Sequence, residues 1–160
     1  MPDPFAMTPP PMVSFAGPSG TGKTTLLEGV ISALKQRGHR VGAVKHDAHR
    51  IELDTEGKDS WRLRQAGADL TLLVGRDQLA WFGTDRPPPD LAEVAKLLAA
   101  DADIILVEGY RSAGLPTVVV SRPDHQDGRW EPPAAELILA TAHPDDVAEV
   151  VELIEQRFLS

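Results

Sequence analysis

The first regular pattern in the chain is a short apolar run that leads directly into a glycine-rich stretch. Residues 12–16 are typical of a buried strand, and the next six residues, 17–22, contain three glycines. Gly38 is placed to end a helix that begins near Lys23. Between Lys23 and Arg37 the apolar side chains that recur at helical spacing are Leu26, Leu27, Val30, Ile31 and Leu34. This pattern predicts a strand, a tight turn and a helix.

Weaker patterning in the middle of the chain predicts further strands around a polar loop and a helix. Residues 45–54 are polar and are expected to form mostly loop. Asp59 or Ser60 is expected to cap a helix that runs through Gln65. Three strands are expected, over residues 40–44, 70–74 and 78–82. The third is expected to be the hairpin partner or the neighbour of the second.

The last part of the chain returns to strong patterning. Asp90 and Glu93 form a capping-box-like start for an amphipathic helix over residues 91–100. Residues 103–109 form a continuous apolar run that ends in a carboxylate, which is typical of a central parallel strand buried on both faces. Asp145 is expected to open a final helix, after strands over residues 117–121 and 137–141.

Alternating strands and helices predict an α/β fold of the P-loop NTPase type, with a mostly parallel twisted sheet and helices on both faces. Residues 12–160 are expected to form one nucleotide-binding domain, and residues 1–11, which are rich in proline, a disordered leader.

The amino-acid composition indicates the cellular location and excludes some classes of partner. The chain has no cysteine, so disulfides and cysteine-ligated metal sites are excluded and the cytoplasm is the expected location. A formal net charge of −8 disfavours nucleic acid and anionic lipid surfaces. The longest apolar runs are of strand length, well below the ~20 residues of a membrane helix, so no membrane partner is expected.

One motif carries specific chemistry: residues 17–24 match the phosphate-binding pattern G-x-x-x-x-G-K-[ST] between a predicted strand and a predicted helix. Glycines allow the backbone to approach phosphate oxygens, and successive N–H groups at a helix start attract the anion. Lys23 is expected to reach the β- and γ-phosphates, Thr24 to bind Mg²⁺, and Thr25 to add a phosphate contact. The predicted phosphate loop comprises Gly17, Pro18, Ser19, Gly20, Thr21, Gly22, Lys23 and Thr24.

Two acidic residues flank the strand that would supply the carboxylate for Mg²⁺. Asp103 precedes residues 104–107 and Glu108 follows them. Because ligands lie at the carboxyl ends of parallel strands, Glu108 is the expected metal and catalytic carboxylate. Gly109 beside it is expected to leave room for the nucleotide or the attacking water.

Other polar residues allow more than one interpretation. Lys45, just beyond a strand end, is placed to stabilise charge on a phosphoryl group. Asp59 fits two roles equally, positioning water or metal in catalysis and capping a helix. His46 and His49 are better interpreted as loop histidines than as metal ligands, because no cysteine is available to complete a zinc site. The turn at residues 141–145 is the expected place for a contact with the base.

With these segments placed, the chain resembles the molybdopterin-guanine dinucleotide biosynthesis protein B family. Beyond the phosphate loop, the resemblance is carried by residues 45–49, 54–60 continuing to 66–68, and 103–110. It implies binding of GTP with slow hydrolysis, a homodimer, and assistance to the guanylyltransferase that joins GMP to molybdopterin; molybdopterin itself is a further partner to consider.

The resemblance also implies roles for single residues. Lys23, Thr24 and Glu108 take the phosphate and Mg²⁺ roles, while Asp59 and the Lys45-His46 pair line the γ-phosphate side or the dimer cleft. Ala48 stands where the family often has a further histidine. Two other functions remain open: a P-loop small-molecule kinase and a binding module without turnover.

Overall fold

The computed structural model describes residues 8–46, 54–83, 89–110, 113–124 and 129–160. The chain forms two compact units: Met1–His46 with Asp90–Ser160, and Asp47–Pro89. Most of the leader predicted over residues 1–11 lies outside the described residues, and the expectation of one domain over residues 12–160 stays a prediction.

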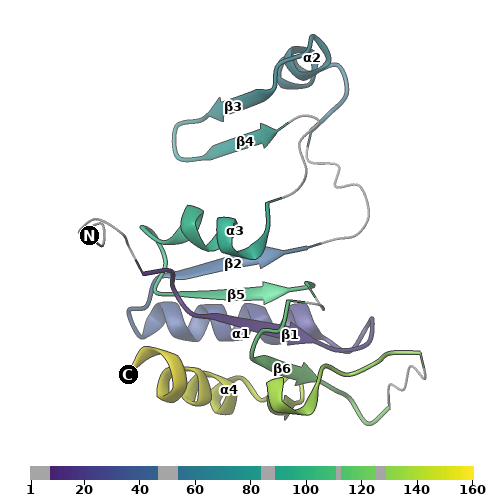
Figure 1. The fold of residues 1–160 in the computed structure, drawn as a ribbon, viewed down its shortest axis with the longest axis vertical. Helices are drawn as coiled ribbons and strands as arrows, with labels where there is room; N and C mark the ends of the chain where they lie inside the picture. The colour runs from purple at the N-terminus through teal and green to yellow at the C-terminus, as the bar shows by residue number, and fades with distance from the viewer. Residues whose placement is uncertain (1–7, 47–53, 84–88, 111–112, 125–128) are drawn as a thin grey trace. The chain divides into compact units, whose positions relative to one another are not determined.

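The first unit is built on a five-stranded, wholly parallel sheet with the strand order β2-β5-β1-β6-β7 (Figure 1). The predicted mostly parallel sheet is therefore confirmed. The direction of the strand order reverses at β1, and such a switch point is where parallel sheets bind ligands. The strands are β1 (Met12–Ala16), β2 (Val41–Lys45), β5 (Ile104–Glu108), β6 (Thr117–Val120) and β7 (Ile138–Ala142).

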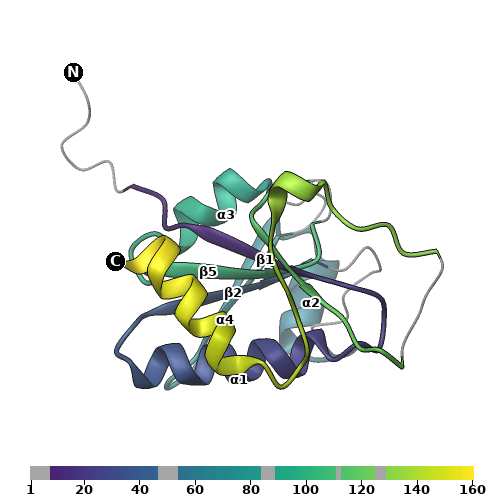
Figure 2. The same cartoon turned by 90° about the horizontal axis from the view of Figure 1, so that it is seen from below.

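Helices cover both faces of this sheet, as the sequence predicts. Helices α1 (Lys23–Gln36) and α4 (Val147–Ile154) lie side by side on one face (Figure 2). Helix α3 (Leu91–Leu98) packs on the other face. Strand β5 shows why both layers are needed: Ile104 and Leu106 belong to the core under α1 and α4, whereas Ile105 and Val107 belong to the core under α3. Its continuous apolar run is the consequence.

Local capping decides where several helices begin. Asp90 accepts a hydrogen bond from the backbone of Glu93, and Glu93 accepts one from Asp90, so the predicted capping box is present. The last helix begins at Val147 rather than at Asp145, because Asp146 is the N-cap residue and accepts from the backbone N–H of His143. Short helical segments η1 (Ala135–Leu137) and η2 (Glu155–Leu159) precede β7 and follow α4. None of the helices in the described part of the chain is long and apolar enough to cross a membrane.

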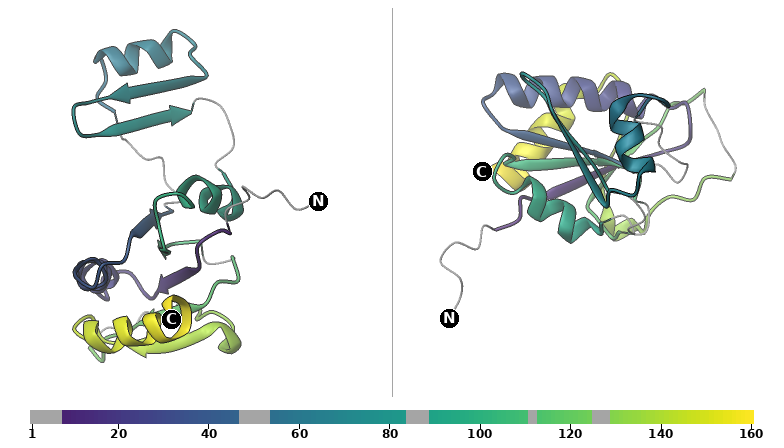
Figure 3. Two further views of the ribbon diagram at one scale, coloured as in Figure 1. Left: turned by 90° about the vertical axis from the view of Figure 1, so that its left-hand side faces the viewer. Right: turned by 90° about the horizontal axis from the view of Figure 1, so that it is seen from above.

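The second unit consists of helix α2 (Asp59–Gln65) and an antiparallel hairpin of β3 (Leu70–Val74) and β4 (Leu79–Gly83) (Figure 3). The idea that Asp59 caps α2 is wrong, because Lys58 is the N-cap residue. On one hairpin face Thr71 is buried, and the Arg64 guanidinium lies 5.0 Å from the ring centre of Phe82. The opposite face consists of apolar side chains that are all at least half exposed: Leu70, Leu72, Val74, Leu79 and Trp81.

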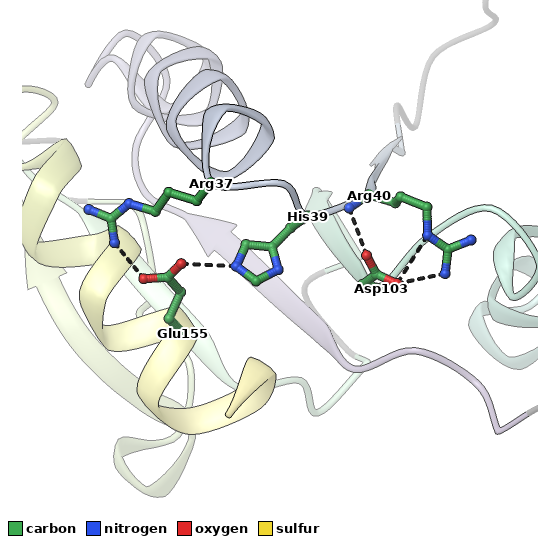
Figure 4. Close-up of polar contacts among 5 residues, drawn as sticks. All are labelled: Arg37, His39, Arg40, Asp103 and Glu155. Carbon is green, nitrogen blue, oxygen red and sulfur yellow. Dashed lines mark hydrogen bonds and ion pairs between the residues drawn. The ribbon is translucent and has the colours of Figure 1, made fainter.

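Two polar clusters fasten the segment after α1 to distant parts of the first unit (Figure 4). Glu155 pairs with the Arg37 guanidinium, and its Oε1 lies 2.9 Å from Nε2 of His39. The backbone N–H of Arg40 donates to Asp103 at 2.8 Å, and its guanidinium donates to the same carboxylate at 2.6 Å. The hydrogen bond with His39 and then the Arg37 interactions lower the pKa of the Glu155 carboxyl below its ordinary value.

The substitution Glu155→Gln is expected to lower the midpoint of thermal unfolding at neutral pH. Because the folded-state pKa of Glu155 is depressed, its stabilisation is complete above the ordinary glutamate pKa and is lost as the pH falls through the lowered value. The deficit of the variant should therefore shrink below about pH 4. Circular dichroism melts across this range test the expectation, with the exposed Glu152→Gln on α4 as control; a deficit independent of pH would contradict it.

Candidate nucleotide site

The glycine-rich loop connects the end of β1 to the start of α1, as predicted. Gly20 and Gly22 have φ angles of 81° and 90°, which side-chain-bearing residues rarely adopt. Thr21 lies between them with its side chain buried, and its hydroxyl donates to the carbonyl of Pro18 at 3.0 Å. The loop is therefore held in one shape by its own backbone.

Neighbouring strands leave no space for side chains at two of the glycines. A Cβ on Gly17 would lie 2.3 Å from the carbonyl oxygen of Val120 at the end of β6. A Cβ on Gly22 would lie 2.6 Å from Cγ of Pro144, in the turn after β7. The loop is thus packed against the carboxyl ends of both strands on one side of β1.

The start of α1 presents positive partial charge, and the first turn of the helix itself contains no acidic residue that would offset it. Its N-cap residue is Gly22, which has no side chain to accept from the first N–H groups, and its first turn contains no acidic residue. Unpaired N–H groups and the helix dipole together attract an anion at such a position. The ammonium of Lys23 adds a full charge, and it donates to the carbonyls of Gly17 at 3.1 Å and Pro18 at 2.7 Å.

A carboxylate, a hydroxyl and a second ammonium meet at the mouth of the loop. The hydroxyl of Thr24 donates to Oε2 of Glu108 at 3.2 Å, although the two residues are 84 positions apart. Lys45 Nζ lies 4.0 Å from Oε1 of the same carboxylate. The parallel register explains this, because Lys45 and Glu108 are direct partners at the ends of β2 and β5. The structure thus brings three of the predicted site residues together.

The oxygens of Thr24 and Glu108 are suited to Mg²⁺, which prefers hard oxygen ligands in octahedral geometry. Two adjacent ligands with bonds of about 2.1 Å lie about 3 Å apart, close to the 3.2 Å between these oxygens. The described residues contain no group of three histidine, aspartate or glutamate side chains placed to hold a metal. Phosphate oxygens and water would have to complete the coordination, as is usual for Mg²⁺ bound with a nucleotide.

A tight turn after β5 fixes the position of Glu108. Gly109 and Tyr110 both have positive φ, at 101° and 46°. The backbone N–H of His46 donates to the carbonyl of Glu108 at 2.8 Å, and its ring centre lies 4.3 Å from that of Tyr110. A Cβ on Gly109 would lie 2.5 Å from the carbonyl oxygen of His46. The space next to Gly109 is therefore occupied by His46, whereas the sequence predicted that Gly109 leaves room for nucleotide or water.

The remaining predicted residues lie in several places. Thr25 is exposed in the first turn of α1, and Ser19 is exposed in the loop. Asp103 lies immediately before β5 and pairs with Arg40, so Glu108 is the carboxylate at the loop. Asp59 belongs to the second unit, where its fully exposed carboxylate lies 3.8 Å from Arg62. His49 lies outside the described residues.

The turn predicted to contact the base packs against the loop. Pro144 is buried beside Gly22, and Nδ1 of His143 lies 3.2 Å from Asp145. Asp146 closes the turn by accepting from the N–H of His143 at 2.7 Å. The turn therefore presents exposed polar groups directly beside the start of α1.

Comparisons with known proteins agree on one family. The family model described as "Molybdopterin guanine dinucleotide synthesis protein B" matches residues 12–143. The molybdopterin-guanine dinucleotide biosynthesis adapter protein of Haemophilus influenzae is 33% identical over 138 residues, 86% of this chain and 78% of the relative. The adapter protein of the same name from Escherichia coli is 38% identical over 116 residues, 70% of this chain and 66% of the relative.

Solved structures share the fold over nearly the whole chain. The crystal structure of Bacillus subtilis MobB has a TM-score of 0.67 and 26% identity, and the match covers 92% of this chain and 98% of that one. A MobB homologue from Bacillus stearothermophilus has a TM-score of 0.60 and 25% identity, with 91% and 96% covered.

The substitution Gly109→Ala is expected to destabilise the protein more than Gly38→Ala. Both glycines have positive φ, so each alanine costs about 1–2 kcal/mol in backbone strain. Only at Gly109 does the new Cβ meet another atom, the His46 carbonyl, and this clash adds about 1–3 kcal/mol. Urea unfolding of the two variants measures the difference, and equal losses of stability would disprove the close contact.

Proposed function

The chain belongs to the molybdopterin guanine dinucleotide synthesis protein B family, and from that premise we propose that it binds Mg²⁺·GTP in the loop at residues 17–24. Its role is that of an adapter in molybdenum cofactor biosynthesis, in which it assists the guanylyltransferase that joins GMP to molybdopterin. The cytoplasm expected from the composition is the location of this activity. The observation that carries the proposal is the contact of Thr24 with Glu108 at the mouth of the phosphate loop.

Phosphate binding in this proposal uses the backbone first and the side chains second. N–H groups of residues 20–24 surround the β-phosphate, and Lys23 exchanges its contacts with two loop carbonyls for phosphate oxygens. Thr24 and Glu108 would hold Mg²⁺, directly or through water. Lys45 neutralises charge at the γ-phosphate from the neighbouring strand.

Preference for guanine is assigned to the turn after β7. Guanine has a ring N–H and an amino group that donate hydrogen bonds to carboxylates. Its carbonyl oxygen accepts hydrogen bonds from N–H groups. The side chain of Asp145 is exposed beside the loop and is the candidate acceptor. Family membership supports GTP over ATP, and this turn is the element of the first unit that would enforce the choice.

Hydrolysis in this proposal is slow. In P-loop proteins, fast hydrolysis needs a residue that orients water and a cation that stabilises the transition state. Glu108 already contacts Thr24 and Lys45, so its carboxylate is committed to metal and charge balance. The role of Asp59 in orienting water stays a prediction from the sequence. Nucleotide turnover therefore serves regulation of the adapter rather than bulk chemistry.

Homodimer formation is proposed through the exposed face of the hairpin. A two-stranded sheet is marginally stable alone, and contiguous exposed apolar patches on soluble proteins usually mark interfaces. Cross-strand pairs on this face place Leu72 opposite Trp81 and Val74 opposite Leu79, so the apolar side chains form one continuous surface. A second copy presents the same surface and is the self-complementary occupant.

Lys23→Ala is expected to weaken GTP affinity by about tenfold to a hundredfold, because a charge-assisted hydrogen bond contributes about 1.5–3 kcal/mol. Glu108→Gln should reduce the gain in affinity that Mg²⁺ provides and leave binding without metal nearly unchanged. Titration with a fluorescent GTP analogue, with and without Mg²⁺, measures both effects.

Two control variants on α1 accompany the GTP titration, and one result would refute GTP as the nucleotide. Lys35→Ala and Glu28→Gln change exposed residues of the same helix, α1, and should bind normally. Binding of ATP in preference to GTP would refute the proposed nucleotide. Phosphate release with and without the transferase separates a slow GTPase from a module without turnover, and transfer of phosphate to an added acceptor would favour the small-molecule kinase.

Val74→Asp is expected to convert the dimer into a monomer, since a charge would have to be buried within the apolar face, opposite Leu79 at the turn end of the hairpin. Light scattering after size exclusion measures the mass. Leu97→Asp is the control, because Leu97 is a similarly exposed apolar residue on α3, away from the hairpin sequence. If the unsubstituted chain has the mass of a monomer at micromolar concentration, the hairpin interface is rejected.

A further inference from the structure

Tyr110, the second residue after β5, is the one residue other than glycine that has a positive φ in the described part of the chain. Its φ is 46° and that of Gly109 is 101°, so two successive residues occupy the left-handed region directly after Glu108. A side chain makes this conformation unfavourable, and it persists only where surrounding contacts impose it. The contacts that hold Tyr110 therefore also determine where the backbone of Glu108 lies.

Tyr110 has contacts of two kinds. It packs against the apolar core under α3, which contains Ile105 and Val107 of β5. It also faces the residue that follows β2: the ring centres of His46 and Tyr110 lie 4.3 Å apart, and the two ring planes are tilted by 41°. Aromatic rings with an offset or tilted arrangement at such a distance attract each other. The left-handed turn is thus supported by the core and by His46.

His46 also contacts the two residues that precede Tyr110. Its backbone N–H donates to the carbonyl of Glu108 at 2.8 Å, which continues the pairing of β2 with β5 one residue beyond Lys45. Its carbonyl oxygen lies so close to Gly109 that a Cβ there would be 2.5 Å away. One residue at the end of β2 therefore approaches all three consecutive residues that set the direction of the Glu108 side chain.

The Glu108 carboxylate is the group that depends on this support. Its Oε2 accepts from the Thr24 hydroxyl at 3.2 Å, a separation close to that of two neighbouring Mg²⁺ ligands. Mg²⁺ requires near-ideal octahedral geometry, so its affinity depends on how firmly each ligand is held. Residues that orient a metal ligand without touching the metal commonly change metal affinity by about tenfold or more.

Resting on the proposed function, we propose that His46 is a positioning residue for the Mg²⁺ carboxylate. Its ring holds Tyr110 in the left-handed turn and so keeps Glu108 directed at Thr24. The imidazole nitrogens take no part in this role, which distinguishes it from the place on the γ-phosphate side that the family resemblance implies. His46 is exposed, so truncating its side chain opens no cavity in the core.

GTP titrations of His46→Ala and His46→Phe, with and without Mg²⁺, test this role. The measured quantity is the ratio of the two dissociation constants, which is the gain in GTP affinity that Mg²⁺ provides. His46→Ala should reduce this gain about twofold to tenfold, the contribution of one aromatic contact, and leave the affinity without metal nearly unchanged. His46→Phe keeps a ring against Tyr110 and should restore the gain.

Tyr110→Ala removes the other ring of the pair. It should reduce the Mg²⁺ gain at least as much, and adding His46→Ala to it should cause no further loss, because both substitutions remove the same contact. His39→Ala is the matched control: His39 precedes β2 whereas His46 follows it, and its substitution removes a contact with Glu155. The control should lower the melting temperature and leave the Mg²⁺ gain unchanged.

Melting temperatures of all variants separate positioning from a general loss of stability. An unchanged Mg²⁺ gain in His46→Ala would overturn the inference and leave the proposed function standing. An equal loss in His46→Phe and His46→Ala would overturn it too, because the imidazole nitrogens would then account for the effect. If the unsubstituted chain binds GTP equally well without Mg²⁺, the proposed metal role of Glu108 is refuted, and the positioning role of His46 is refuted with it.

Discussion

An anion receptor made of backbone N–H groups works only if the protein itself does not neutralise them. In this chain the start of α1 has a glycine as its cap and no acidic residue in its first turn. The adjoining loop is confined by Val120 at the end of β6 and by Pro144 after β7. Val120 approaches Gly17, and Pro144 approaches Gly22, so closely that a side chain on either glycine would clash. The packing of the sheet therefore keeps the receptor open and in one conformation, which is the condition for strong anion binding.

The side chains that complete the site follow from the order of the strands. Because β5 lies between β2 and β1, the parallel register places Lys45 and Glu108 side by side, and Glu108 contacts Thr24. One ammonium and one carboxylate at this sheet edge form an ion pair, and in the proposed function they would contact phosphate and metal. A different strand order would separate these residues while leaving the loop motif unchanged.

Sequence patterns predicted the parts of this fold that depend on local chemistry. The phosphate loop, the capping box at Asp90 and the doubly buried β5 are all set by residues close together in the chain, and each is present. The contact of His46 with Gly109 was not predictable, because it depends on two loops brought together by strand order. Asp59 shows the same limit: its sequence context fits a helix cap, but Lys58 occupies that position.

The two units differ in how much of their apolar surface is buried, and this difference is relevant to the function of an adapter. The first unit buries both faces of its sheet under helices, and the phosphate loop lies at the carboxyl ends of its strands. The hairpin has α2 against one face and a continuous apolar surface on the other, so its exposed surface favours association. In the proposed function, nucleotide binding and assembly therefore depend on separate segments of one chain. Because each segment can be altered without changing the residues of the other, the effect of GTP on assembly can be measured directly, and that coupling free energy is the quantity that defines an adapter.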